Sequence, residues 1–299
     1  MTDANLMTVP DAAADPARRK RSEALYFAVR NPKLIVGGTV LVALLLLAIV
    51  GPYLTDNPPN DYVGPKASPP SGDYWFGTTT FGQDVFSQFV HGLRTTFVVG
   101  VLGGGIAALI GMAVGFTAGY RGGRVDEFLN MVTNIVLVIP TLAVLLVVSA
   151  YLKARGVLVE GLFVGFTSWP WAARAIRAQT FSLTARDFVD LARLSGLRTR
   201  RIIFREIAPN MSSYLVMTWI LLFGGSILIA ATLDFIGLGP TNGTSLGLMM
   251  NNAVLWSALQ LGMWWWFIPP GLGITAVVGG LYIMNVGLDE VFNPRLREL

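Results

Sequence analysis

The sequence predicts an all-α membrane protein with six spanning helices. Of its 299 residues, 53% are hydrophobic and only 13% are charged, and the mean hydropathy is +0.58. Long apolar runs also recur along the chain. Such values are unusual for a soluble globular protein. A chain of this length can form one bundle of about six helices, because each span needs about 20 apolar residues.

Six apolar runs are suited to membrane-spanning helices. The first is longer than the core of a secretory signal and no small-residue cleavage site follows it, so we expect a retained anchor. We therefore expect one membrane domain over residues 34–288, preceded by a tail of residues 1–33 and followed by a tail of residues 289–299. The spans are predicted at about 34–54, 95–119, 128–152, 156–173, 213–233 and 264–287.

The distribution of basic residues predicts the orientation of these spans. With the N-terminus inside, 18 of the 22 Lys and Arg residues fall on the cytoplasmic side, in agreement with the positive-inside rule. We therefore expect both termini in the cytoplasm and the Pro- and Gly-rich segment 55–94 outside. The excess positive charge suits loops that lie against an anionic lipid leaflet, so it requires no nucleic acid as a partner.

Two features inside the spans predict how the helices pack. Small residues repeat every four positions in the second span, which allows another helix to approach closely. Pro140 in the third span is expected to kink that helix. The small residues are Gly103, Ala107, Gly111, Gly115 and Gly119.

The segment from Arg174 to Asn210, between the fourth and fifth predicted spans, carries eight of the 22 basic residues. Residues at helical spacing predict two short helices. One face of the first carries Phe188, Leu191, Ala192 and Ser195, and one face of the second carries Ile202, Ile203 and Ile207. Gly196 between them can adopt the left-handed backbone that ends a helix, and Pro209 limits the second helix. The segment is either an amphipathic element on anionic lipid or a docking element for a cytoplasmic partner.

The stretch DLARLSGLRTRRIIFREIAPN in this segment resembles the EAA loop of permease subunits of ABC importers. It departs from the family pattern with Asp for Glu at 190, Leu for Ala at 191, Glu for Ile at 206 and Ala for Leu at 208. In that family the loop is a coupling helix that sits in a groove of an ATP-binding subunit. The resemblance thus implies an ATPase-coupling loop built on Asp190, Leu191, Ala192, Gly196 and Pro209.

Further motifs resemble the permeases of dipeptide and oligopeptide uptake systems, and in particular the C-type member of the pair. The stretch FGTTTFGQDVFSQFVHGLRTT is similar to their external motif, and GYRGGRVDEFLN, DFIGLGP and NPRLREL resemble three more signatures in the same order. The resemblance implies the type I ABC importer permease fold, with an external loop after the first span and the coupling loop between spans four and five. The external motif residues are Gly77, Thr78, Gly82, Asp84 and Arg94.

The energy source is expected to lie outside this chain. The sequence contains no GxxxxGK[ST] phosphate loop, no cysteine and one histidine, and no recognisable catalytic constellation. We therefore expect neither an enzyme nor a resident cofactor or metal. The resemblance implies two separate ATP-binding subunits that hold ATP and Mg, a second homologous permease and an extracytoplasmic solute-binding protein, all at the bacterial cytoplasmic (inner) membrane.

Two alternatives remain open for the function. Peptides are the first expectation for the cargo, but LQLGMWWWFIPPGLGI and the C-terminal sequence look somewhat more like sugar-carrying relatives. The same machinery could thus carry oligosaccharides, or nickel or another small solute. A secondary transporter is the alternative class, and it should show intramembrane acidic residues, whereas the predicted spans show no organised ionisable cluster. No residue of the solute path is assigned.

Overall fold

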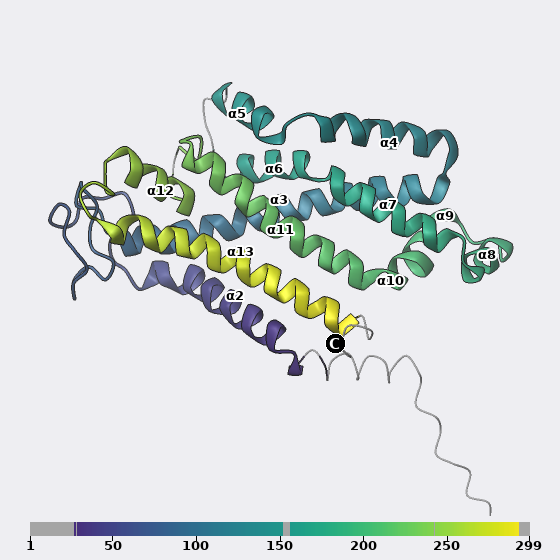
Figure 1. Cartoon of the computed structure of the whole chain (residues 1–299), viewed down its shortest axis with the longest axis horizontal. Coiled ribbons are helices and arrows are strands. Elements are labelled where there is room, and N and C mark those ends of the chain that lie inside the picture. The colour runs from purple at the N-terminus through teal and green to yellow at the C-terminus, as the bar shows by residue number, and fades with distance from the viewer. Residues whose placement is uncertain (1–26, 28, 152–155, 242, 293–299) are drawn as a thin grey trace, which may run out of the picture.

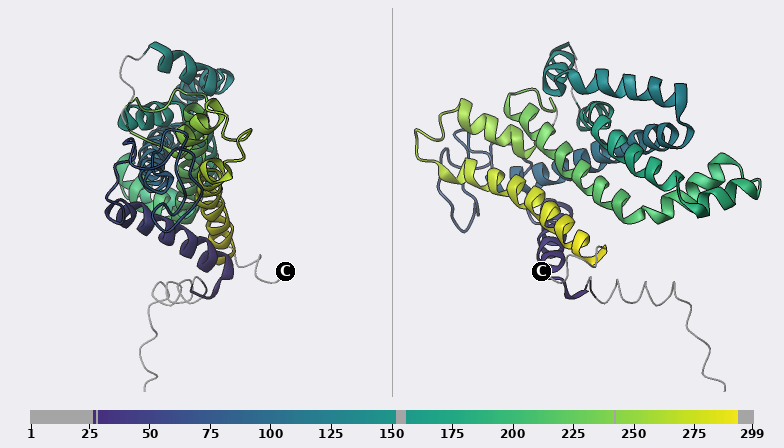
Figure 2. Two further views of the ribbon diagram at one scale, coloured as in Figure 1. Left: turned by 90° about the vertical axis from the view of Figure 1, so that its left-hand side faces the viewer. Right: turned by 45° about the vertical axis from the view of Figure 1, so that its right-hand side comes forward.

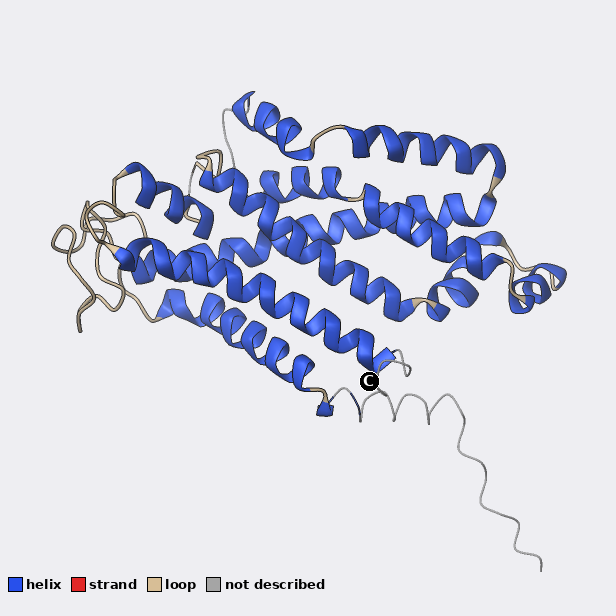
Figure 3. Ribbon diagram, viewed as in Figure 1, coloured by secondary structure: helices blue, strands red, loops and turns tan. Residues whose placement is uncertain are grey.

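The computed structural model describes residues 27, 29–151, 156–241 and 243–292, and over these residues the chain consists of helices and loops (Figure 3). The long helix α3 (Val85–Arg121) packs against α6 (Val157–Ser168), α7 (Pro170–Thr184) and α11 (Ser212–Phe235). The pair α4 (Gly123–Val138) and α5 (Thr141–Tyr151) lies along one edge of the bundle, and α2 (Pro32–Val50) lies along the opposite edge (Figures 1 and 2).

Four helical segments in the described residues are long and apolar enough to cross a membrane. They are Pro32–Tyr53, which joins α2 to the short 3₁₀ helix η1 (Gly51–Tyr53), then α3, α11 and α13 (Trp264–Phe292). The pair α4 and α5 adds a fifth if it is counted as one span bent by 74°. The predicted multi-pass helical architecture is confirmed, and the number of six stays a prediction.

The fourth predicted span, 156–173, is divided in the structure. Helix α6 has only 12 residues, and α7 begins at Pro170 and continues to Thr184. Proline lacks a backbone N–H and its ring crowds the preceding turn, which explains the break.

The second predicted span begins ten residues earlier than expected, at Val85. The side chain of Asp84 accepts hydrogen bonds from the backbone N–H groups of Phe86 (2.9 Å) and Ser87 (3.3 Å) and so caps the helix. With 37 residues the helix is about 55 Å long. It therefore extends well beyond the roughly 30 Å of a hydrocarbon core.

The third predicted span, 128–152, is broken at Pro140, where the sequence predicts a kink. Ile139, which precedes Pro140, has extended backbone angles (φ −76°, ψ 122°), because the proline ring disfavours the helical region for the residue before it. Pro140 therefore does more than kink the helix.

The small residues of α3 provide the close helix approach that their spacing predicts. A Cβ atom on Gly115 would lie 2.8 Å from the carbonyl oxygen of Ala173, and one on Gly119 would lie 2.6 Å from that of Arg177. Larger side chains at these positions would push α7 away from α3. This close contact is between α3 and α7, two helices of the same chain.

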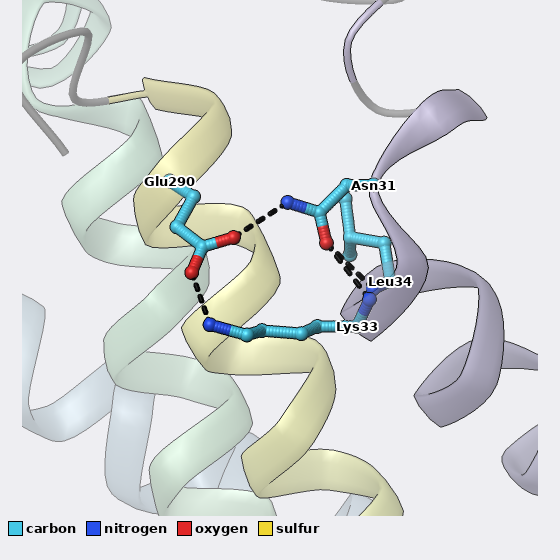
Figure 4. Close-up of polar contacts among 4 residues, drawn as sticks. All are labelled: Asn31, Lys33, Leu34 and Glu290. Atoms are coloured by element: carbon cyan, nitrogen blue, oxygen red, sulfur yellow. Dashed lines mark hydrogen bonds and ion pairs between the residues drawn. The ribbon is translucent and has the colours of Figure 1, made fainter. Parts of the chain in front are cut away.

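A second close pair of helices, α2 and α13, is joined by polar contacts at its end (Figure 4). Asn31 accepts hydrogen bonds from the N–H groups of Lys33 and Leu34, which caps α2, and its amide donates to Glu290 at 2.8 Å. The Lys33 ammonium forms an ion pair with the same carboxylate. Further along, a Cβ on Gly37 would lie 2.6 Å from the carbonyl oxygen of Gly280.

The helix α12 (Leu246–Leu255) was not predicted from the sequence. Its first turn is capped by Ser245, whose hydroxyl accepts from the N–H of Leu248 at 3.0 Å. Leu246, Met249 and Ala253 are buried in the main core. With ten residues the helix is too short to span a membrane, so a search for long apolar runs passes over it.

The predicted tails fall mostly outside the described residues. Helix α2 begins at Pro32, within the predicted N-terminal tail, and α13 continues to Phe292 instead of ending near 287. The basic cluster at 18–21 and the C-terminal NPRLREL motif lie outside the described residues.

Candidate functional site

The predicted coupling loop contains two short helical segments joined by a sharp turn. The first is α8 (Asp187–Leu194), and the second runs through α9 (Thr199–Ile202), the π-helical turn η2 (Ile203–Ile207) and α10 (Ala208–Asn210). They lie at the opposite end of the bundle from α12 and the segment 55–84 (Figures 1 and 2).

Gly196 ends α8, as the sequence predicts. Its φ of +71° lies in the left-handed region. The N–H of Gly196 bonds to the carbonyl of Arg193 at 3.0 Å, and the N–H of Leu197 bonds to that of Ala192 at 3.2 Å. This is the Schellman pattern, which satisfies the last carbonyl groups of a helix. The turn therefore has a fixed geometry that reverses the chain.

The inward face of α8 differs from the predicted one. Val189 and Ala192 are buried in a cluster with Ile202 and Ile207, whereas Leu191 is 63% exposed. Leu194 is exposed to 86%. Of the four predicted face residues, Ala192 is buried and Phe188 packs against the same cluster, whereas Leu191 and Ser195 are exposed. The prediction is therefore confirmed for Phe188 and Ala192 and wrong for Leu191 and Ser195, because the buried face is turned toward Val189, three residues before Ala192. The spacing of Val189 and Ala192 could have revealed the buried face.

Asp190 lies on the exposed side of α8 and is paired within the helix. Its carboxylate accepts a hydrogen bond from Arg193 at 2.9 Å. The Arg193 guanidinium also lies 5.3 Å from the ring centroid of Tyr120, near the end of α3, within range of a cation–π contact. Arg193 thus links the exposed side of α8 to the central helix.

Pro209 shapes the second segment of the loop. It cannot donate a backbone hydrogen bond, and its ring crowds the turn before it. The N–H of Ala208 reaches the carbonyl of Ile203, five residues back, which is the widened π-type turn. The helix ends at Asn210, so the predicted limit near Pro209 is confirmed.

The outer surface of the loop is both basic and apolar. Phe204 is exposed, as are Leu191 and Leu194 on the other segment. The exposed arginines around them are Arg193, Arg198, Arg200, Arg201 and Arg205. Exposed apolar side chains with a polar surround are typical of interaction sites.

The loop is attached to the bundle through α7. Arg177 of α7 forms a two-pronged ion pair with Asp126 of α4, and Arg174 donates to Asn134 of α4 at 2.6 Å. Only two residues separate α7 from α8. Helix α8 is thus connected through α7 to both α3 and α4.

The external motif is brought together by the structure, with one exception. Asp84 is 4% exposed, and besides capping α3 it accepts a hydrogen bond from Asn57 at 3.1 Å. Thr78 forms an isolated backbone bridge with Asp84, and its carbonyl accepts from the Trp265 indole at 3.1 Å. The fifth motif residue, Arg94, lies apart on an exposed side of α3.

The two glycines of the external motif are required by backbone geometry. Gly77 has a φ of +68° and Gly82 a φ of +84°, where most other residues are strained. A Cβ on Gly82 would lie 2.3 Å from the carbonyl oxygen of Gly64. These residues hold the external loop in shape, and no chemical reaction follows from their arrangement.

The structure also brings together two acidic residues that sequence reasoning did not connect. Glu160 in the first turn of α6 lies against Asp234 near the end of α11, and Asp234 is buried. The expectation that the spans hold no organised ionisable groups is thus corrected. The pair comes from helices distant in the sequence, so local spacing carried no signal for it.

Comparison with known proteins assigns the chain to a family. The family described as "Binding-protein-dependent transport system inner membrane component" matches residues 111–298, a range that includes the whole coupling loop. The chain belongs to this family. It is therefore a multi-pass membrane permease component of an ABC-type transporter and not an enzyme.

Related permeases are similar over nearly the whole chain. The dipeptide transport system permease protein DppC of Bacillus subtilis (strain 168) is 28% identical over 293 residues, which covers 96% of this chain and 89% of the relative. The oligopeptide transport system permease protein OppC of the same organism is 30% identical, with 90% and 87% covered. The probable D,D-dipeptide transport system permease protein DdpC of Escherichia coli (strain K12) is 27% identical, with 97% and 98% covered.

Proposed function

We propose that this chain is one permease subunit of an ATP-driven importer of dipeptides or oligopeptides. The observation that carries the proposal is α8, which is fixed to the bundle by buried Val189 and Ala192 and presents Leu191 and Leu194 outward. An exposed apolar ridge on a rigid helix is suited to a groove on a partner. The names of the similar permeases support peptides as cargo.

In this proposal the chain crosses the bacterial cytoplasmic membrane six times, with both termini in the cytoplasm. The bent pair α4 and α5 forms the third span, and α6 with the start of α7 forms the fourth. The predominance of basic residues in the proposed cytoplasmic segments supports this orientation. So does the location of the coupling loop and the segment 55–84 at opposite ends of the bundle (Figure 1).

The proposed importer contains a second homologous permease, two ATP-binding subunits and an extracytoplasmic solute-binding protein. ATP and Mg would be held by the ATP-binding subunits. Closure of those subunits would move α8 as a lever, and α7 would carry the movement into the bundle as a hinge or shear motion. Leu191, with Asp190 beside it, contacts the partner in this scheme, while Ala192, Gly196 and Pro209 fix the shape of the lever.

Cross-linking tests the docking of α8. The chain contains no cysteine, so Leu194→Cys introduces a single thiol on the exposed ridge. We expect this variant to cross-link to an ATP-binding subunit in the purified complex. Tyr62→Cys, also at an exposed position but in the external loop, is the matched control and should not cross-link to it. Cross-linking by Tyr62→Cys alone would contradict the proposed orientation and coupling role.

Uptake into proteoliposomes tests the energy source and the cargo. The reconstituted complex with its binding protein should accumulate dipeptides only when ATP is supplied. Uptake of an oligosaccharide but not of a peptide would show that the cargo is an oligosaccharide, and the proposed coupling scheme would still stand. Uptake that follows an ion gradient without ATP would instead support a secondary transporter, in which the Glu160–Asp234 pair would become the first group to study.

A further inference from the structure

Helix α4 has few buried side chains of its own. Among its described side chains only Thr133 is buried, and among those of α5 only Leu145 is. Val132 and Val136 of α4 are partly buried against a cluster that comes mainly from α3 and α7. Apolar contacts are non-directional, and the break at Pro140 separates α4 from α5. The apolar contacts therefore do not by themselves fix the position of α4 along α7.

Two polar contacts between α4 and α7 do fix that position. Arg177 of α7 forms a two-pronged ion pair with Asp126 of α4, and Arg174 donates to Asn134 at 2.6 Å. The two arginines lie about one turn apart on α7, and their two acceptors lie about two turns apart on α4. Hydrogen bonds depend on direction as well as on distance. These four residues, here called the α4–α7 ladder, therefore resist sliding of one helix past the other.

The ion pair of the ladder is better placed than an ordinary surface pair. The side chains of Arg177 and Asp126 are 32% and 19% exposed. Those of Lys33 and Glu290, which join α2 to α13, are 48% and 26% exposed. Exposed pairs contribute little, because water and salt screen them. A two-pronged pair between an arginine and a carboxylate is stronger and more directional, so this pair is suited to holding α4 and α7 together.

Arg177 also lies where α7 packs closely on α3. A Cβ atom on Gly119 of α3 would lie 2.6 Å from the carbonyl oxygen of Arg177. The connection from α7 to α8 is a hydrogen-bonded turn. In it the N–H of Arg186 donates to the carbonyl of Leu183 at 3.1 Å, and the N–H of Val189 donates to the carbonyl of Arg186 at 2.9 Å. Helix α7 therefore has ordered contacts with the coupling loop at its end and with α3 and α4 along its length.

We propose that the α4–α7 ladder makes α4 follow α7 when the ATP-binding subunits move the coupling loop. This inference rests on the proposed function and extends it from the loop to a named contact inside the bundle. Arg177 and Asp126 are positioning residues, because neither touches the solute or the nucleotide in this scheme. Without the ladder the ATP-binding subunits would still hydrolyse ATP, but α4 would no longer move with α7. Less solute would then be transported for each ATP.

The ratio of peptide taken up to ATP hydrolysed tests the inference. It is measured on the complete importer, reconstituted with its binding protein. Asp126→Ala removes the acceptor of the ion pair. We expect it to lower the ratio about tenfold, within the usual range of coupling between two sites, while ATP hydrolysis continues. The matched control is Glu290→Ala, which removes the acceptor of the ion pair between α2 and α13 and should leave the ratio unchanged.

Two further variants separate coupling from folding. Asp126→Arg combined with Arg177→Asp rebuilds the ion pair in the opposite direction and should restore most of the ratio. Arg177→Lys retains the positive charge but cannot form two parallel hydrogen bonds, so it should lower the ratio less than Asp126→Ala does. Thermal unfolding of each assembled complex checks that the variants are folded.

A fluorescent label on α4 measures the movement itself. The chain has no cysteine, and Val138 at the end of α4 is 81% exposed, so Val138→Cys gives one labelling site in this chain. We expect the emission of an environment-sensitive label there to change when ATP is added, and Asp126→Ala to abolish that change. The control is a label at Val36→Cys on α2, whose signal Asp126→Ala should not alter.

The outcomes separate this inference from the proposed function. If the unmodified importer shows no ATP-driven uptake, the proposed function fails and the inference fails with it. If it takes up peptides and Asp126→Ala keeps the same ratio, the ladder is no part of the coupling and the proposed function stands. An equal fall for Glu290→Ala, or no recovery on exchange of the two charges, would also overturn the inference. If Asp126→Ala prevents assembly, Arg177→Lys decides, and an unchanged ratio there overturns it.

Discussion

The two ends of the bundle carry motifs of opposite physical character. In the external segment, the motif residues Thr78 and Asp84 are buried, and their polar groups are bonded to neighbours within the chain. In the coupling loop, Leu191 and Leu194 are exposed. A motif whose polar groups are satisfied internally maintains the shape of its own chain, whereas a motif that leaves apolar side chains in solvent is suited to contact another molecule.

The largest expected effect comes from a matched pair of glycines, one in each region. Gly82→Ala combines strain at a φ of +84° with a Cβ placed 2.3 Å from the carbonyl oxygen of Gly64. We expect it to lower the free energy of unfolding by about 3 kcal/mol or more. Gly196→Ala meets no neighbouring atom, so only its backbone strain of about 1 kcal/mol remains. Thermal unfolding of the two purified variants in detergent would measure these losses of stability. Equal losses for Gly82→Ala and Gly196→Ala would contradict the predicted difference between the two regions.

The next effect concerns the buried cap of α3. Asp84→Ala removes the acceptor for two backbone N–H groups and for the Asn57 amide. We expect a loss of about 2 kcal/mol, because a helix cap contributes about 0.5–2 kcal/mol and buried donors are left unpaired. Asn57→Ala, which removes only one of these bonds, should cost less. Chemical unfolding followed by tryptophan fluorescence would rank the two, and a larger loss for Asn57→Ala would argue against the capping role.

A third change tests the exposed ridge of α8. Leu194→Asp should alter the free energy of unfolding by no more than about 0.5 kcal/mol, since the side chain has few contacts in its own chain. It should nevertheless weaken the binding of the ATP-binding subunits about tenfold or more, because a charge would enter an apolar contact. Co-purification of these subunits at several protein concentrations would measure this. Tyr62→Asp in the external loop is the control and should leave their recovery unchanged.

The smallest expected effect is that of Asp190→Ala on stability. Asp190 and Arg193 form an exposed ion pair, and such pairs contribute between about 0 and 1 kcal/mol. We expect a change in the free energy of unfolding below about 0.5 kcal/mol, in contrast to Asp84→Ala. A loss comparable to that of Asp84→Ala would show that α8 is held by its polar contacts instead of by Val189 and Ala192.

Several elements could be predicted because their causes are local. The apolar runs located α2, α3, α11 and α13. Pro140 marked the distortion between α4 and α5, and Gly196 marked the end of α8. Asp84 also carried a local signal as a helix cap. The prediction missed it because the search for spans began at the first long apolar run and treated the polar first turns of α3 as loop.

Other features had no local cause. Helix α12 is stabilised by burial of Leu246 and Met249 in a core built from distant segments. Whether Leu191 or Val189 points inward depends on where α3 and α9 lie. The meeting of Glu160 with Asp234 depends on the packing of α6 against α11.

The sequence by itself determined that this protein is a multi-pass helical membrane protein, where most of its helices lie and to which family it belongs. Hydropathy, proline and glycine act through the chain within one or two helical turns, so these conclusions need no tertiary information. Only the tertiary structure decided which side of each helix is buried and which charges meet. Those outcomes depend on contacts between residues far apart in the chain, and local residue patterns do not specify such contacts.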